Sequence, residues 1–203
     1  MRDQLIQAAI EKFGSRGFDA VGTREIAAAV DTPMSSITYH FGGKEGLYLA
    51  AAEFIFDYLR DSIDPPVQYF AEDAPRAARL DAFVAVLRKM AEFMLDERSA
   101  KFALFISREQ QAPTPAVLQM MDDKVMPMMR ALVEQVKALR PELAADEAKA
   151  LTIYLFGMAI ALRHTRASMS LLFEREDFGS EMQKMLIDQL EASVRAILGA
   201  GPR

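Results

Sequence analysis

The chain has 203 residues, of which 51% are hydrophobic and 26% charged, with a net charge of −5 and no cysteine. This composition is that of an ordinary soluble protein with one large or two small domains, and it excludes disulfides, thiolate zinc sites and cysteine nucleophiles. Its two histidines leave little for a metal site, so we expect neither metal nor cofactor.

The sequence offers no membrane span. Its longest apolar run, residues 153–162, falls well short of the roughly 20 residues that a span requires. The chain opens with Met1-Arg2-Asp3 and passes directly into an amphipathic pattern, without the apolar centre of a signal peptide. We therefore expect a cytoplasmic protein that does not contact a membrane.

The first predicted helix spans residues 2–16. Apolar side chains recur along it at spacings of three and four, which indicates one buried face. Gly14 and Gly17 bracket its end. The members of this stripe are Leu5, Ile6, Ala9, Ile10 and Phe13.

Two short helices are predicted next, over residues 23–30 and 34–40. Thr23 is a suitable N-cap for the first, and Asp31-Thr32-Pro33 breaks it. Proline suits the first position of a helix, so Thr32 is expected to cap the second. This second helix is about two turns long, buries little besides Ile37, and ends at two consecutive glycines.

Most side chains of that second helix are unexplained as core residues. Small hydroxyls, an aromatic ring and an imidazole can reach base edges and phosphates in a major groove. The alternative is a solvated helix whose tyrosine packs on a neighbour. The side chains concerned are Ser35, Ser36, Thr38, Tyr39 and His40.

This helix-turn-helix resembles the N-terminal domain of the TetR family of bacterial transcription regulators. The matching positions are Thr23, Ile26, Ala27, Ile37, Tyr39, His40, Phe41, Lys44, Glu45 and Leu47. The chain departs from the family pattern at Asp31, Pro33 and Thr38, where a turn glycine, a serine cap and a tyrosine are usual. The stretches ITYHFGGKEGLYLA and MMDDKVMPMMRALVEQV resemble the CecR-like subgroup.

The resemblance implies a DNA-binding domain over residues 1–46 and an effector-binding, dimerising domain over residues 47–203. The helix over residues 34–40, called the reading helix below, is expected to contact bases. The resemblance adds phosphate or base contacts from the starts of the helices that begin at Thr23 and Lys44. The predicted DNA-binding residues are Thr23, Arg24, Met34, Ser35, Ser36, Thr38, Tyr39, His40 and Lys44. Charge gives no support, because residues 1–46 hold five basic residues (Arg2, Lys12, Arg16, Arg24 and Lys44) and six acidic ones.

The rest of the chain is predicted to be entirely helical, which makes the fold class all-α. A helix from Lys44 to about Asp61 joins the two domains, and Ile63-Asp64-Pro65-Pro66 follows it as a break. Further helices are expected over residues 75–95, 99–110 and 115–139, the last kinked at Pro127. Two more are expected over residues 147–167, capped by Asp146, and from Ser180 to Leu198.

A methionine-rich region indicates a binding site for a small, largely apolar effector. Thioethers suit a pocket that accepts irregular apolar ligands, although each is equally well explained as core. Charged groups at the ends of apolar helices would orient the ligand, or else be solvated or paired. The candidates are Met90, Met94, Phe102, Phe105, Arg108, Met121, Met129, Arg163 and His164.

The last two long helices are predicted to form a homodimer interface. Residues 153–162 are apolar on every side, which a helix on the surface of a monomer would not sustain. The alternative is an internal bundle, but the resemblance favours pairing across a two-fold axis. The expected interface residues are Tyr154, Gly157, Met158, Ala161, Leu186, Leu190, Val194 and Ile197.

An enzyme is not expected. Di-iron chemistry in a helical bundle needs Glu-x-x-His pairs, which neither histidine forms, and no P-loop, dinucleotide fingerprint or nucleophile elbow is present. We therefore predict a ligand-responsive transcriptional repressor that binds a palindromic double-stranded DNA operator. The alternative function is a helical protein-interaction module without sequence-specific DNA binding.

Overall fold

A computed structural model describes residues 1–63 and 74–200 of the chain, and every regular element within them is a helix. This confirms the all-α prediction. The chain divides into two compact units. The first unit comprises Met1–Arg60 and Arg98–Val125, and the second comprises Asp61–Glu97 and Met126–Arg203. The break expected at Ile63-Asp64-Pro65-Pro66 does not include Ile63, which is the last residue of the helix Lys44–Ile63, and its other three residues lie outside the described residues.

The first unit begins with the predicted helix-turn-helix. Helices α1 (Arg2–Arg16), α2 (Thr23–Ala29) and α3 (Ser35–Phe41) lie close to the predicted bounds and lead into α4 (Lys44–Ile63). Helix α2 packs against both α1 and α3. Their apolar faces meet in a small core, whose members include Leu5, Ile10, Phe13, Val21, Ile26, Ile37 and Leu47.

Both predicted caps in this region are wrong. Helix α2 has Gly22 as its N-cap, and Thr23 is its first helical residue. Helix α3 has Met34 as its N-cap, and the Thr32 hydroxyl bonds instead to that of Ser36 at 3.0 Å. The amide of Ser36 bonds to the carbonyl of Pro33. The turn before the helix therefore forms without a bond from the Thr32 side chain to a backbone amide.

Helices α6 (Ala100–Gln111) and α7 (Pro115–Lys124) complete the first unit. Helix α6 packs against α1, and the two approach closely at Gly14. A Cβ at that position would lie 3.2 Å from the backbone nitrogen of Phe105. The compact first unit is therefore larger than the predicted DNA-binding domain, whose end at residue 46 stays a prediction about function.

The long helix expected over residues 115–139 is two helices. Helix α7 ends at Lys124, and α8 (Met126–Leu139) begins after Val125. Pro127 lacks an amide hydrogen, so it cannot donate the helical bond to the fourth preceding residue. The result is a break at Val125, two residues before the proline, rather than the predicted kink. Pro127 thereby falls in the first turn of α8, where an amide donor is not required.

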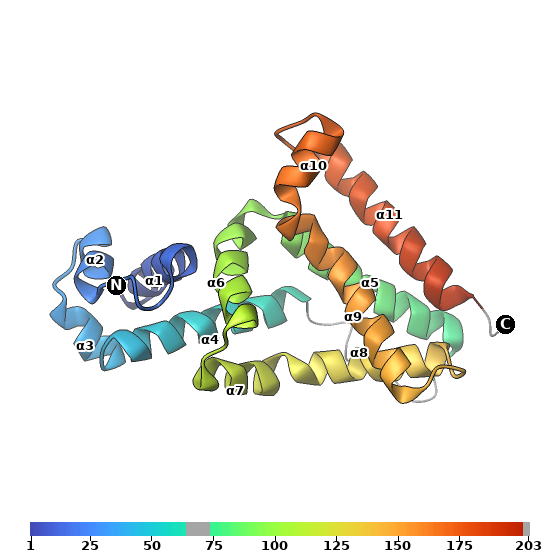
Figure 1. Ribbon diagram of the computed structural model, residues 1–203, viewed down its shortest axis with the longest axis horizontal. Coiled ribbons are helices and arrows are strands. Elements are labelled where there is room, and N and C mark those ends of the chain that lie inside the picture. The colour runs from blue at the N-terminus through green and yellow to red at the C-terminus, as the bar shows by residue number, and fades with distance from the viewer. Residues whose placement is uncertain (64–73, 201–203) are drawn as a thin grey trace. The chain divides into compact units, whose positions relative to one another are not determined.

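The second unit is built around α5 (Arg76–Leu95), which packs against α8, α9 (Ala145–His164) and α11 (Ser180–Gly199). A short 3-10 helix, Glu97–Ser99, follows α5. An additional helix, α10 (Arg166–Phe173), lies at the turn from α9 to α11 (Figure 1).

The prediction that one helix continues past His164 is wrong. Helix α9 ends there with Thr165 as its C-cap, at φ −103° and ψ 19°, and the Thr165 hydroxyl bonds to the carbonyl of Ala161 at 2.7 Å. At the other end, Asp146 is not the cap that was predicted. Ala144 is the N-cap, and the Glu147 carboxylate accepts a 2.7 Å bond from its amide.

Candidate nucleic-acid interface

Helix α3 turns almost all of its side chains outward. Of its seven residues only Ile37 is buried, and Tyr39 is 85% exposed. A helix of two turns with one buried side chain contributes little to a core, so its outward face is open to a partner. The predicted DNA-binding residues Met34, Ser35, Thr38, Tyr39 and His40 are all exposed, and Ser36 is half-buried.

Glycines determine where α3 ends, and one of them, Gly46, was not predicted to have this role. Gly42 has φ 75° and ψ 0°, a left-handed conformation that glycine adopts without steric cost. At Gly46, in the first turn of α4, an added Cβ would lie 1.8 Å from the carbonyl oxygen of Phe41. Any side chain there would push α3 away from α4. A glycine inside an otherwise helical stretch was the available signal.

Helix α2 is held to α1 through Glu25. Its carboxylate accepts a hydrogen bond from Arg16 and pairs with Lys12 at 3.3 Å. These contacts, the Arg16 bond first, hold the pKa of Glu25 below its usual value. The pairing also neutralises cations of α1, so these charges contribute little attraction toward a phosphate backbone.

Two other predicted contact residues lie at helix starts. Arg24 is exposed in the first turn of α2, and Thr23 beside it is half-buried. Lys44 opens α4, with its amine 4.4 Å from the centre of the Phe18 ring. A cation held over an aromatic face is restrained without a carboxylate partner, so its charge stays available.

A buried polar group ties α4 to α6 within the first unit. Glu109 is only 3% exposed, and one carboxylate oxygen accepts a bond from the Tyr48 hydroxyl. The other accepts a 3.0 Å bond from the amide of Thr114, the N-cap of α7. Burial, and then the bond to Glu109, raise the pKa of Tyr48 well above its usual value. The buried bond between Glu109 and Tyr48 could not be predicted from the sequence, because the two residues lie far apart along the chain.

The nine predicted effector residues are divided between the units. Phe102, Phe105, Arg108 and Met121 belong to the first, and Met90, Met94, Met129, Arg163 and His164 to the second. Both phenylalanines, Met90 and Met94 are buried side chains of their own unit's core. Neither unit alone contains the whole set, so its grouping as one site stays a prediction.

The two arginines of this set bind backbone carbonyls. Arg108 donates 2.7 Å bonds to the carbonyls of Gly14 and Ser15 at the end of α1. Arg163 donates bonds of 2.8 and 2.5 Å to those of Met94 and Asp96 at the end of α5, and burial lowers its pKa. Both guanidiniums thus satisfy helix C-termini, a structural role that the sequence analysis did not consider. His164 is exposed.

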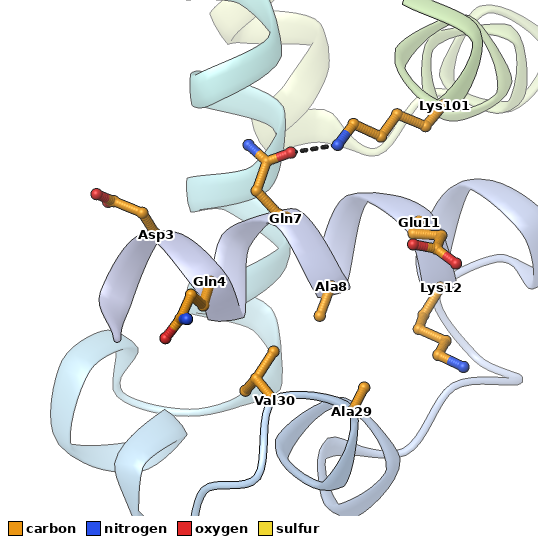
Figure 2. Close-up of a pocket in the computed structure, with 9 residues that line it drawn as sticks. All are labelled: Asp3, Gln4, Gln7, Ala8, Glu11, Lys12, Ala29, Val30 and Lys101. Atoms are coloured by element: carbon orange, nitrogen blue, oxygen red, sulfur yellow. Dashed lines mark hydrogen bonds between the residues drawn. The ribbon is translucent and has the colours of Figure 1, made fainter. Parts of the chain in front are cut away.

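A hollow of about 520 Å³ lies in the first unit along α1, and Figure 2 shows its lining, which includes the end of α2 and Lys101 of α6. Ala8, Ala29 and Val30 supply apolar surface, and the amine of Lys101 is bonded to the Gln7 carboxamide at the rim. The remaining lining residues are Asp3, Gln4, Glu11 and Lys12. None of the predicted DNA-binding or effector residues lines it.

Of the predicted dimer residues, those on α9 lie on an open face of the second unit. Tyr154 is 71% exposed, and nothing lies within 4 Å of a Cβ added at Gly157. Met158, Ala161 and Leu186 are half-buried, and Ile197 is exposed. Leu190 and Val194 are buried in the protomer's own core, so their place in a dimer interface stays a prediction.

Within residues 1–63 and 74–200, no helix combines the length and apolarity needed to cross a membrane. The same residues contain no group of three or more His, Cys, Asp or Glu side chains that could hold a metal ion.

Two family descriptions match this chain. Residues 5–51 match "Bacterial regulatory proteins, tetR family", and residues 79–201 match "HTH-type transcriptional dual regulator CecR, C-terminal domain". The HTH-type transcriptional dual regulator CecR of Shigella flexneri is 31% identical over 203 residues, covering 97% of this chain and 91% of that protein. The matched families are transcriptional regulators and not enzymes.

Solved structures agree in fold. AibR, in complex with isovaleryl coenzyme A and operator DNA, has a TM-score of 0.71 at 14% identity, over 95% of this chain and 96% of that one. A TetR-family regulator from Bordetella parapertussis has a TM-score of 0.68 at 17% identity, over 100% and 98% of the two chains. At such identities the likeness concerns the fold alone.

Proposed function

The chain belongs to the TetR family of bacterial transcription regulators and carries a CecR-type C-terminal domain, and on that premise we propose that it is a cytoplasmic, homodimeric repressor. It occupies a pseudo-palindromic operator and leaves it when a small, largely apolar effector binds. The observation that carries the DNA half of this proposal is α3, whose single buried residue leaves a whole face of hydroxyl, phenol and imidazole groups outward.

We assign the reading of bases to α3 and the fixing of its register to the flanking helix starts. Tyr39, Thr38 and His40 can bond or pack against base edges in a major groove, which admits one α-helix. Lys44 and Thr23 approach phosphates from helix N-termini, where backbone amides favour anions. Arg24 reaches either a base or a phosphate. The DNA-binding function is assigned to residues 1–46 and the effector and dimer functions to residues 47–203.

The dimer is assigned to α9 and α11 of the second unit. Ile153 and Tyr154 are 62% and 71% exposed on α9, and Met185 and Ile197 are exposed on α11. Several exposed apolar side chains on these two helices favour association with a second copy. A two-fold dimer would present two reading helices to half-sites about one helical turn apart, roughly 34 Å, or a multiple of it.

The effector step follows from energetics. Shifting a dimer from about 99% to 1% DNA-competent requires roughly 5.5 kcal/mol of differential binding, or a little under 3 kcal/mol from each of two pockets. Burial of a mid-sized apolar ligand can supply that amount. AibR, a protein of similar fold, was solved in complex with isovaleryl coenzyme A and operator DNA, so this fold can bind both a small-molecule ligand and DNA.

The test is binding of the full-length protein to duplexes from the region upstream of its own gene, measured by fluorescence anisotropy and footprinting. We expect protection of a pseudo-palindrome and at least 1,000-fold weaker binding to a scrambled duplex. Tyr39→Ala and Arg24→Ala should change the preferred sequence, whereas Lys44→Ala should weaken all sequences alike. Equal affinity for both duplexes would instead favour the protein-interaction module.

A reporter driven by the protected site tests the direction of regulation. Repression predicts that expression rises when the regulator is deleted. Because the Shigella flexneri relative is a dual regulator, the same experiment measures activation, and a fall in expression on deletion would contradict the repressor assignment.

A further inference from the structure

The charge balance around the reading helix leaves few cations for a phosphate backbone. Lys12 and Arg16 both pair with Glu25. Of the basic residues in the first 46, this leaves Arg2, Arg24 and Lys44, and within the described residues none of the three forms an ion pair with a carboxylate. In a chain of net charge −5, these three side chains are the cations of residues 1–46 that remain available to phosphates. Only Arg24 and Lys44 are among the DNA-binding residues predicted from the sequence.

Arg2 lies beside the end of the reading helix. It is the first residue of α1, yet its guanidinium carbon is 5.4 Å from the centre of the Phe41 ring, the last residue of α3. The side chain is exposed. Its neighbour Asp3 lines the hollow on α1 (Figure 2), and adjacent helical residues point about 100° apart. The Asp3 carboxylate therefore does not pair with the Arg2 guanidinium.

Contact with a ring leaves the guanidinium's hydrogen-bonding capacity unused. A cation over an aromatic face is held by the ring quadrupole, while the five N–H donors stay in the guanidinium plane. Phosphate oxygens accept such donors in pairs. Lys44, held over Phe18 just after α3, is restrained in the same way. Each of these cations is thus tethered close to the C-terminal end of α3 without being neutralised.

We propose that Arg2 is a phosphate-binding residue of the operator complex, held at the end of α3 by the Phe41 ring, and that it acts with Lys44 to fix the reading helix on the duplex. The inference rests on the proposed DNA binding. Because Arg2 contacts the sugar-phosphate backbone and no base edge, it contributes equally to every sequence.

The experiment measures the affinity of full-length protein for operator and scrambled duplexes from 0.05 to 0.5 M salt. In Arg2→Ala the slope of log K against log [salt] should be smaller by about 0.9, the value for one phosphate contact. If parent and variant bind DNA equally at 1 M salt, this slope difference makes the variant bind about fivefold more weakly than the parent at 0.15 M salt. The loss should be the same for both duplexes, so the ratio of the two affinities stays unchanged.

Two variants separate position from charge. Arg2→Lys keeps a cation at the site and should restore most of the slope. Arg175→Ala makes the same charge change in an exposed residue of the second unit and should leave the slope at the parent value. Thermal unfolding of all variants should match the parent, since Arg2 is exposed.

An unchanged slope in Arg2→Ala overturns the proposal, and so does a changed sequence preference, because that would make Arg2 a base reader. An equal fall in Arg175→Ala overturns it as well, by reducing the effect to net charge. Failure of the DNA-binding function is a different result: the unmutated protein would then show no preference for the operator over the scrambled duplex.

Discussion

Helices α3 and α9 are both poorly covered by their own protomer, but they expose different chemistry. Helix α3 buries one of seven residues and exposes hydroxyls, a phenol and an imidazole. Helix α9 buries four of twenty and exposes Ile153 and Tyr154. A polar open face fits a hydrated, charged partner such as DNA, whereas an apolar open face is stabilised only by excluding water. The chemistry of the side chains that a poorly covered helix exposes therefore indicates which kind of partner it binds.

The units also differ in what their exposed helices pack against. Helix α3 depends on glycine contacts at its end and on a small core. In the second unit, α9 packs against the central helix α5. Exposed apolar residues also occur on α10, where Leu171 and Leu172 are 82% and 78% exposed. Substitutions that affect one open face and spare the other will show whether the two functions are separable.

The largest effect is expected from Gly46→Ala. The new Cβ would lie 1.8 Å from the Phe41 carbonyl oxygen, so α3 must move relative to α4. We expect a loss of about 3 kcal/mol in the free energy of unfolding, at the upper end for overpacking, together with loss of operator binding. Urea denaturation and anisotropy measure the two effects. Dimerisation through the second unit should persist.

Gly22→Ala is the matched control in the same region. It is also an N-terminal helix position, but nothing lies within 4 Å of an added Cβ. This variant should retain operator binding. If both variants bind operator like the parent, the close contact at Gly46 does not set the position of α3.

Gly157→Leu is expected to disturb only the apolar face of α9. The protomer has space for the side chain, because nothing lies within 4 Å of the Cβ, so its folding should be unaffected. Across a close-packed dimer the same side chain should cost about 1–3 kcal/mol. Sedimentation should reveal monomers at concentrations where the parent is dimeric. Gly179→Leu, at another open glycine of the second unit, should leave the dimer intact, and an unchanged dimer in Gly157→Leu would move the interface elsewhere.

Tyr48→Phe tests the polar tie within the first unit. It keeps the ring contacts but removes one bond to the buried Glu109 carboxylate, so we expect a loss of about 1–2 kcal/mol in the free energy of unfolding at neutral pH. The pKa of Tyr48 is raised in the folded protein. Its contribution is therefore complete below the usual pKa of about 10 and declines as pH rises above it.

Denaturation of parent and variant from pH 7 to 11 checks this prediction. The difference between them should shrink toward the alkaline end. Tyr154→Phe, at an exposed tyrosine of α9, is the control and should match the parent in protomer stability at each pH. A difference that does not vary with pH would contradict an intact hydroxyl bond to Glu109.

The smallest effect is expected from Glu25→Gln, which removes the exposed pairs between α1 and α2. The pKa of Glu25 is held below its usual value of 4.5, so its contribution is present above that value and is lost as pH falls through the lower folded pKa. The melting temperature of the variant should be slightly below the parent's at pH 7, and the difference should shrink as the pH is lowered below 4.5. Glu11→Gln, at an exposed acid of the same region, should leave the melting temperature at pH 7 unchanged.

Much of the first unit could be predicted from local pattern. The stripe of Leu5 to Phe13, the Asp31-Thr32-Pro33 break and the Gly42-Gly43 end depend on neighbours a few residues apart, and α1, α2 and α3 lie close to the predicted bounds. The caps were less predictable. Thr23 and Thr32 are good capping residues by type, but backbone turns at Gly22 and Met34 began the helices instead.

Periodicity, turn chemistry and motif spacing are enough to predict an all-helical chain, a short helix near residue 37 with a polar outer face, and a resemblance to TetR regulators. Which side chains are already bonded or buried within the protein is known only from its fold. Arg108 binds the end of α1, Glu109 binds Tyr48, and Val194 lies inside the protomer. The reason is physical: such contacts join residues tens of positions apart, and local spacing carries no information about which distant group a side chain will meet.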